Sequence, residues 1–147
     1  MKELIQVVYI SRSTFVRSEN FKGIEPSVGR ILLKSRTNNR RINVTGVLYF
    51  GDGCFFQCLE GEPASVDELL LKLEKDSRHH DITVLSRKLI KTRSFGDWEM
   101  KFVAIEESMT KLLESRGFQR FDPYRFDGPM VESVLNLLGS AAVAQSE

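Results

Sequence analysis

Short runs of apolar and β-branched residues, separated by polar or glycine-containing segments, recur along the first 106 residues. Five of these runs have the length and composition of strands, and they cover residues 4–11, 44–50, 54–60, 82 to about 90, and 98–105. Gly51, Asp52 and Gly53 lie between the second and third runs, which predicts a hairpin with a bulge or a slightly longer loop. The pattern therefore predicts a sheet.

Two segments have the helical spacing of apolar residues instead. Near residues 25–37, apolar side chains recur at i, i+3 and i+4, and the two asparagines that follow end this helix. Residues 65 to about 76 repeat the pattern, and Ser65 and Glu68 have the spacing of a capping box at its start. The order β-α-β-β-α-β, followed by one further strand, predicts an α+β fold of the ferredoxin-like sandwich type.

The last part of the chain, residues 107–147, carries two more amphipathic segments. The first is expected to end at Gly117, and the second to lie between Pro129 and Gly139. In the first strand both sets of alternating positions are largely apolar, so both faces of the sheet need cover. We expect these C-terminal helices, or a second subunit, to cover the sheet face that the ferredoxin-like helices leave bare.

The composition agrees with one folded domain in a cytoplasmic protein. The chain has 147 residues, with 21 Lys plus Arg against 20 Asp plus Glu, and a near-neutral balance gives no bulk reason to expect nucleic acid or an anionic membrane. No apolar run approaches the roughly 20 residues of a membrane-spanning helix. Cys54 and Cys58 lie on one strand, on the order of 13 Å apart, so we expect reduced thiols and no metal site.

A ferredoxin-like fold by itself does not decide between several kinds of protein. An RNA-recognition domain would present aromatic side chains on one exposed sheet face, whereas Phe55 and Phe56 fall on opposite faces. An acylphosphatase-like enzyme would need a phosphate cradle near the first loop; Arg12 and Arg17 are available there, but no glycine-rich loop accompanies them.

Polar residues at strand positions that packing would make apolar are more informative. Gln57 lies between Phe56 and Cys58 in the middle of a strand, and Tyr9 shares its face with Ile5 and Val7. Taken singly, each such residue has an ordinary explanation as an edge residue or a satisfied core polar group. The same holds for the helix-ending asparagines, for the Trp98 and Met100 alternation, and for Arg78, His79 and His80, which are typical of a solvated turn.

Together, these residues resemble the BLUF family of blue-light sensors that use FAD. The resemblance covers about residues 3–106 and rests on five motifs in order, and these are VVYISRS, NNRRINVTGVLYF, CFFQCLEG, DSRHHDI and SFGDWEMKF. Each motif alone would be weak, but their joint order and spacing are specific. The resemblance implies a flavin ring held between the two helices of the sandwich.

The resemblance also implies which residues hold FAD. Asn39 would bond the flavin C4 carbonyl and N3–H, which an amide can do because it carries both an acceptor and donors. Asn38 would contact the ring and the side chain of the cofactor, and Ile31 and Leu73 would pack on the two ring faces. At the C2 carbonyl edge of the ring, the resemblance implies contacts with Arg78, His79, Lys72 and Asp76.

The function implied is a photoswitch. Light would excite the flavin, Tyr9 would donate an electron and then a proton through Gln57, and the Gln57 amide would end rotated or tautomerised. A new donor at the flavin carbonyl would shift the absorption to the red. Trp98 and Met100, on the last strand, would compete for a place near Gln57 and read the switch.

The signal would then pass to a separate protein or change self-assembly. Residues 1–106 would be the photosensor and residues 107–147 the capping and output extension, acting on a separate protein or on self-assembly into a homo-oligomer. We expect no enzyme activity, no direct nucleic-acid binding and no membrane binding. The alternatives are a light-independent flavin or small-ligand module, or a small acylphosphatase-like enzyme.

Overall fold

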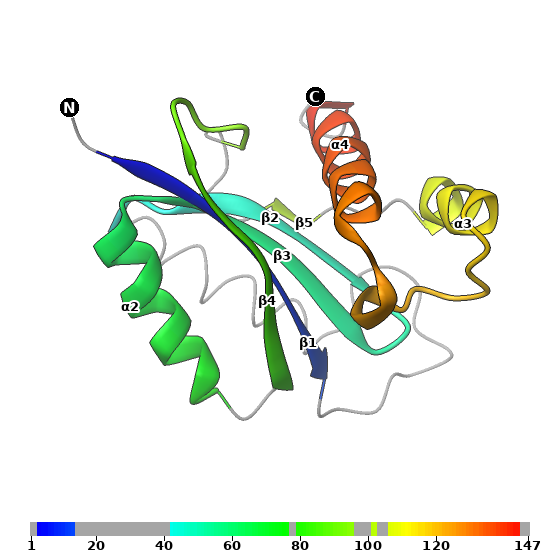
Figure 1. Cartoon of the computed structure of the whole chain (residues 1–147), viewed down its shortest axis with the longest axis horizontal. Helices are drawn as coiled ribbons and strands as arrows, with labels where there is room; N and C mark the ends of the chain where they lie inside the picture. The colour runs from blue at the N-terminus through cyan, green and yellow to red at the C-terminus, as the bar shows by residue number, and fades with distance from the viewer. Residues whose placement is uncertain (1–2, 14–41, 77–78, 96–100, 103–105, 145–147) are drawn as a thin grey trace.

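One sheet organises the protein. The computed structural model describes residues 3–13, 42–76, 79–95, 101–102 and 106–144 (Figure 1). Its strands lie in the order β4-β1-β3-β2-β5, with β1 Leu4–Ser13, β2 Thr45–Gly51, β3 Cys54–Gly61, β4 His79–Ile90 and β5 Lys101–Phe102. The first four strands pair antiparallel, and β5 pairs parallel to β2.

This strand order confirms the ferredoxin-like α+β fold. β3 lies between β1 and β2 and pairs antiparallel with both, so β1 and β2 run parallel, as in the ferredoxin-like fold. The helix expected near residues 25–37 lies outside the described residues. Of the strand expected over 98–105, the described part is β5.

The hairpin is tighter than the sequence predicted. Gly51 pairs with Cys54, so the loop consists of Asp52 and Gly53 alone, without a bulge or extra residue. Both loop residues have positive φ, 48° and 77°, which is the conformation of a two-residue type I′ turn whose twist matches that of the strands. The Asp52 carboxylate also accepts a hydrogen bond from the Phe121 N–H at 2.7 Å and so ties the turn to the C-terminal part of the chain.

Helix α2, Pro63–Glu74, begins three residues earlier than the capping box, with Ser65 as its N-cap, predicted. Its N-cap is Glu62, which makes no side-chain capping bond, and Pro63 occupies the first turn. The fixed φ of proline favours that position, and its missing N–H costs nothing there, so proline outweighs the Ser65 signal. The helix also ends at Glu74, short of Asp76.

Helices cover both faces of the sheet, as expected. Figure 1 shows α2 on one side and α3, Glu106–Ser115, with α4, Gly128–Ala144, on the other. A short 3₁₀ helix η1, Pro123–Arg125, lies between α3 and α4. Two buried apolar clusters result. We call the cluster between the sheet and α2 the α2-side core, and the cluster between the sheet and the C-terminal helices the C-terminal-side core. The two cysteines are buried and reduced, and they belong to the C-terminal-side core.

Two boundaries differ from the sequence prediction. Helix α3 is followed by Gly117 with φ +83°, as predicted, but α4 continues through Gly139 to Ala144. A Cβ at position 139 would lie 3.5 Å from a Phe95 ring carbon, so α4 packs closely here against the loop after β4 and does not end at the glycine. His79 and His80 belong to β4 and pair with Ser13 and Arg12, so the expectation of a solvated turn was wrong.

No helix within the described ranges is both long enough and apolar enough to cross a membrane. The cytoplasmic location remains a prediction.

Glu60 is a fully buried carboxylate on the C-terminal side of the sheet. It accepts hydrogen bonds from Gln6 Nε2 at 2.9 Å and from the Ser94 and Phe95 N–H groups at 3.1 and 2.7 Å. Arg93, next to this loop, donates to the Glu60 backbone carbonyl at 2.9 Å. The carboxylate therefore fixes the chain that leads from β4 toward β5.

We expect Glu60→Ala to lower the free energy of unfolding by about 2 to 4 kcal/mol, because it leaves the buried Gln6 amide and Phe95 N–H without their acceptor. Urea unfolding of the FAD-loaded protein measures this. Glu132→Ala is the control, since Glu132 pairs with Lys88 at 3.5 Å on the surface and should cost less than about 1 kcal/mol. Equal losses for the two variants would contradict the role assigned to Glu60.

Candidate functional site

Tyr9 and Gln57 lie directly opposite each other on the two central strands, β1 and β3. Their side chains are 0% and 5% exposed. Directly opposite residues on antiparallel strands have Cβ atoms about 4.5–5.5 Å apart and share a face of the sheet. Tyr9 belongs to the α2-side core with Ile5 and Val7, which confirms the predicted face.

The Tyr9 hydroxyl is buried, and among the residues that the structure describes it has no hydrogen-bond partner. Burial raises the pKa of Tyr9 well above its usual range, and the nearby negative charge of Asp76 raises this pKa further. Tyr9 therefore keeps its proton at Oη. A buried phenol with no described partner is costly, so it fits a site whose bound group supplies the acceptor.

The C-terminal end of α2 forms one edge of this region. Leu73 is half-buried against the α2-side core, and the half-buried Asp76 follows the helix, with its N–H bonded to the Leu73 carbonyl at 3.1 Å. Lys72 lies on the outer surface of the helix, where its ammonium group is 3.8 Å from the Glu68 carboxylate. Of these three residues, Leu73 and Asp76 are placed toward Tyr9, and Lys72 is placed toward solvent.

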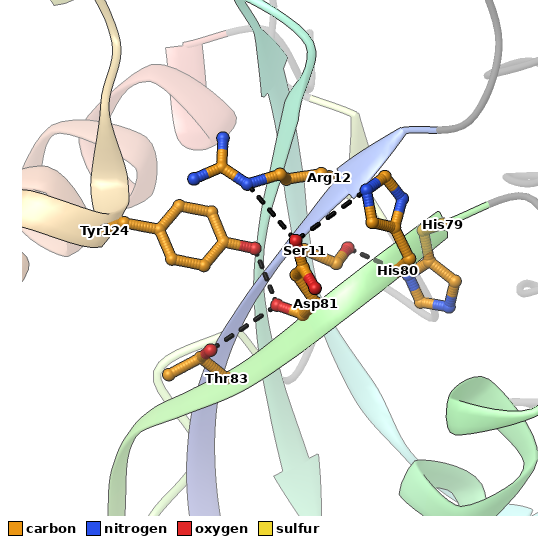
Figure 2. Close-up of polar contacts among 7 residues, drawn as sticks. All are labelled: Ser11, Arg12, His79, His80, Asp81, Thr83 and Tyr124. Carbon is orange, nitrogen blue, oxygen red and sulfur yellow. Dashed lines mark hydrogen bonds and ion pairs between the residues drawn. The ribbon is translucent and has the colours of Figure 1, made fainter.

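His79 joins the end of α2 to β1. Its Nε2 lies 2.7 Å from the Leu73 carbonyl oxygen and its Nδ1 lies 2.8 Å from Ser11 Oγ (Figure 2). Because a carbonyl only accepts, Nε2 carries the hydrogen, and in the neutral ring Nδ1 accepts from the Ser11 hydroxyl. The family resemblance placed His79 at the cofactor but did not single out Ser11, although Ser11 shares the face of Tyr9 by strand alternation.

Six of the residues assigned to the site fall outside the described residues, and these are Ile31, Asn38, Asn39, Arg78, Trp98 and Met100. Their roles stay predictions. Among the described residues, no group of three or more His, Cys, Asp or Glu side chains could hold a metal ion.

Comparison with known proteins decides what kind of site this is. Residues 4–101 match the family described as "Sensors of blue-light using FAD", BLUF. The chain belongs to the BLUF family. FAD is therefore its cofactor, and the buried Tyr9 hydroxyl and the amide of Gln57 offer donors and an acceptor that suit the polar edge of a flavin.

BLUF proteins of known structure resemble most of this chain. BlsA in its photo-activated state is 31% identical, with a TM-score of 0.81, over 92% of this chain and 94% of that one. The dark-state structure of BlrB, a BLUF protein, is 28% identical, with a TM-score of 0.72, over 98% of each chain. Both structural similarities extend beyond residue 101 and so include C-terminal elements of this chain.

A relative of known activity matches over a shorter region. The photoactivated adenylate cyclase subunit beta of Euglena longa is 32% identical over 108 residues, which are 73% of this chain and 12% of that protein. The subunit beta of Euglena gracilis is 33% identical over 99 residues, 11% of its length. The chain thus spans about an eighth of the curated relatives that it matches.

Proposed function

We propose that this chain is a blue-light photoreceptor whose switch is the Tyr9–Gln57 pair. The observation that carries the proposal is the buried Tyr9 hydroxyl, without a partner among the described residues, directly across from a buried glutamine. A residue whose only task is packing would not need this hydroxyl, since burying it without a partner costs stability.

The described part of the site supplies residues to hold FAD. Leu73 offers apolar surface, while Asp76 and His79 lie at the end of α2 beside β1. The BLUF pattern adds Asn39 and Asn38 for the polar edge of the ring, Ile31 for its other face and Arg78 for its C2 carbonyl. Lys72 is placed toward solvent, so it would act only on an exposed part of the cofactor.

FAD, when bound, would supply a ring that absorbs blue light and can take up an electron. Tyr9 supplies that electron and, because an oxidised phenol is strongly acidic, moves its proton from Oη toward the Gln57 amide. The two ends of an amide differ as donor and acceptor. When the electron has returned, Tyr9 would regain a proton at Oη, and the Gln57 amide would be left rotated or in its other tautomer. The site would then have a different hydrogen-bond pattern without net chemistry, and the absorption would be shifted to the red.

We infer further that the chain senses and does not catalyse. In support, the chain resembles BlsA over 94% and the BLUF protein BlrB over 98% of those chains. Residues 1–106 would sense light, and residues 107–147 would pass the signal to a cytoplasmic partner protein or to self-assembly. Trp98 and Met100 would report the state of Gln57 to the last strand.

Tyr9→Phe tests the proposal directly. We expect the variant to bind FAD but to lose the light-induced red shift, because phenylalanine keeps the ring and removes the proton at Oη. Absorption spectra before and after blue light, with dark recovery, measure this. Tyr49→Phe is the matched control, since Tyr49 is buried in the same sheet but belongs to the C-terminal-side core.

A wild-type red shift in Tyr9→Phe would rule out Tyr9 as the donor. A wild-type protein that binds FAD without any red shift would favour the light-independent flavin module instead. Loss of the red shift in Tyr49→Phe as well would show that the effect is not specific to the site.

A further inference from the structure

The pairing of β1 with β4 contains an irregularity beside the switch. Ile10 pairs with Thr83 and Arg12 pairs with His80, so both Asp81 and Ile82 stand opposite the single residue Ser11. Asp81 has φ +55°, in the left-handed region that a non-glycine residue rarely adopts. This is a β-bulge, and its conformation persists only if the surroundings hold it.

On the C-terminal side, the bulge is held by η1. The Tyr124 hydroxyl donates to the Asp81 backbone carbonyl at 2.6 Å, and the Arg12 guanidinium lies 4.1 Å from the centre of the Tyr124 ring (Figure 2). Arg12 Nε is also 3.5 Å from the Asp81 carboxylate. Burial raises the pKa of the Tyr124 hydroxyl to about 12, so this hydroxyl remains a donor at neutral pH.

On the α2 side, the same place is held by His79. Ser11, opposite the bulge, bonds to His79 Nδ1, and His79 Nε2 bonds to the last turn of α2. Figure 2 shows His79 on one side of Ser11 and Tyr124 on the other. Tyr9 lies two residues before Ser11 and faces the same core. The strained backbone segment at Asp81 and the facing Ser11 are thus held by contacts on both faces of the sheet.

We propose that the Asp81 bulge transmits the state of the Tyr9–Gln57 pair through the sheet, and that Tyr124 is the residue of the C-terminal extension that receives it. The inference rests on the proposed photoswitch. Tyr9, Ser11 and Arg12 belong to one short stretch of β1. A change in the position of this stretch alters the Ser11–His79 contact on one face and the Arg12–Asp81–Tyr124 contacts on the other.

The β1–β4 pairing is irregular at two places, between Val8 and Tyr9 and between Ile10 and Arg12. The second suits this task because it contains Asp81, whose left-handed φ departs from regular strand backbone. Regular strand pairs resist local change, whereas a left-handed aspartate held by side-chain contacts such as those from Tyr124 and Arg12 can relax when one contact is lost. Coupling between two sites needs such a two-state element. A second tie between the sheet and this part of the extension runs from Asp52 to the Phe121 N–H, at the β2–β3 turn. This turn adjoins the end of β1, since the Gly53 carbonyl accepts from the Ser13 N–H at 2.9 Å, but the tie does not involve Asp81.

The test is Tyr124→Phe in the full-length, FAD-loaded protein. The variant keeps the ring beside Arg12 and loses the bond to the Asp81 carbonyl. We expect a wild-type red shift, because Tyr124 is not part of the switch. We expect dark recovery to slow by about three- to tenfold, the effect of losing one hydrogen bond made in the resting state. Hydrogen exchange should also lose its light-minus-dark difference over residues 118–140.

Asp52→Gly is the matched control. It removes the other tie to the extension, and glycine accepts the positive φ of that position. We expect its recovery to stay within about twofold of wild type and its exchange difference to persist.

Wild-type recovery and exchange in Tyr124→Phe would overturn the inference while leaving the photoswitch intact. Equal effects of Tyr124→Phe and Asp52→Gly would also overturn it, since they would show general loosening of the extension. Absence of a red shift in the wild-type protein would instead contradict the proposed function on which the inference rests.

Discussion

Gln57→Leu is expected to yield a protein that binds FAD and shows no red shift in blue light. Leucine has nearly the volume of glutamine, so the buried position between Phe56 and Cys58 remains filled. It has no donor or acceptor, so nothing on β3 can exchange hydrogen bonds with Tyr9. Light-minus-dark absorption spectra of the purified variant measure the loss, and the flavin content of the same sample measures retention.

Gln6→Leu provides the control for this substitution. Gln6 is also 5% exposed and also lies on a central strand, but it bonds to Glu60 on the opposite face. Its replacement should lower stability and leave the red shift in place. A normal light-minus-dark spectrum in Gln57→Leu would contradict the switch mechanism, and loss of the spectrum in both variants would point to general damage to the sheet.

The sequence was sufficient to predict the strands and their partners in the hairpin. Alternation of apolar residues is a local signal, and the Gly51–Gly53 segment is a local turn signal, so both could be found without the fold. The face shared by Tyr9, Ile5 and Val7 followed from the same alternation. That Tyr9 and Gln57 stand opposite each other is a matter of register between distant segments, which local patterns do not determine.

Residues whose role depends on distant partners were missed. Ser11 stood at the end of a predicted strand without a role, and Asp81 and Tyr124 were given none. Their contacts arise only where β1, β4 and η1 meet. Glu60 appeared in a family motif without a physical role, because a charged residue at the end of a strand usually faces water. The energetic cost of burying its carboxylate is offset only when the loop after β4 brings two backbone N–H groups to it.

The start of α2 shows a different kind of failure, a competition between two local signals. Both a capping box at Ser65 and a proline at the first turn are valid start signals. They predict starts three residues apart, and the chain follows Pro63. The sequence contained the correct start signal, but the prediction gave more weight to the capping box than to the proline.

Removal of residues 107–147 is expected to separate light sensing from output. Met109, Val134 and Leu138 are fully buried against the sheet, and burying such side chains stabilises by about 1.5 to 3 kcal/mol each. A chain that ends at Glu106 would therefore expose the apolar face of β1 and β3 that these helices cover. We expect it to keep FAD and the red shift, because Tyr9 and Gln57 lie on the other face, but to aggregate or change its oligomeric state.

Size-exclusion chromatography and pull-down of partners, each in the dark and under blue light, measure the loss of output in the truncated protein. Full-length Gln57→Leu serves as the control that cannot switch, and any light effect that it shows is unrelated to signalling. Light-dependent assembly or partner binding should appear only in the full-length wild-type protein. If the truncated protein keeps the same oligomeric state and still responds to light in these assays, the signal must leave through the sheet itself or its edge, and the C-terminal helices serve only to cover an apolar face.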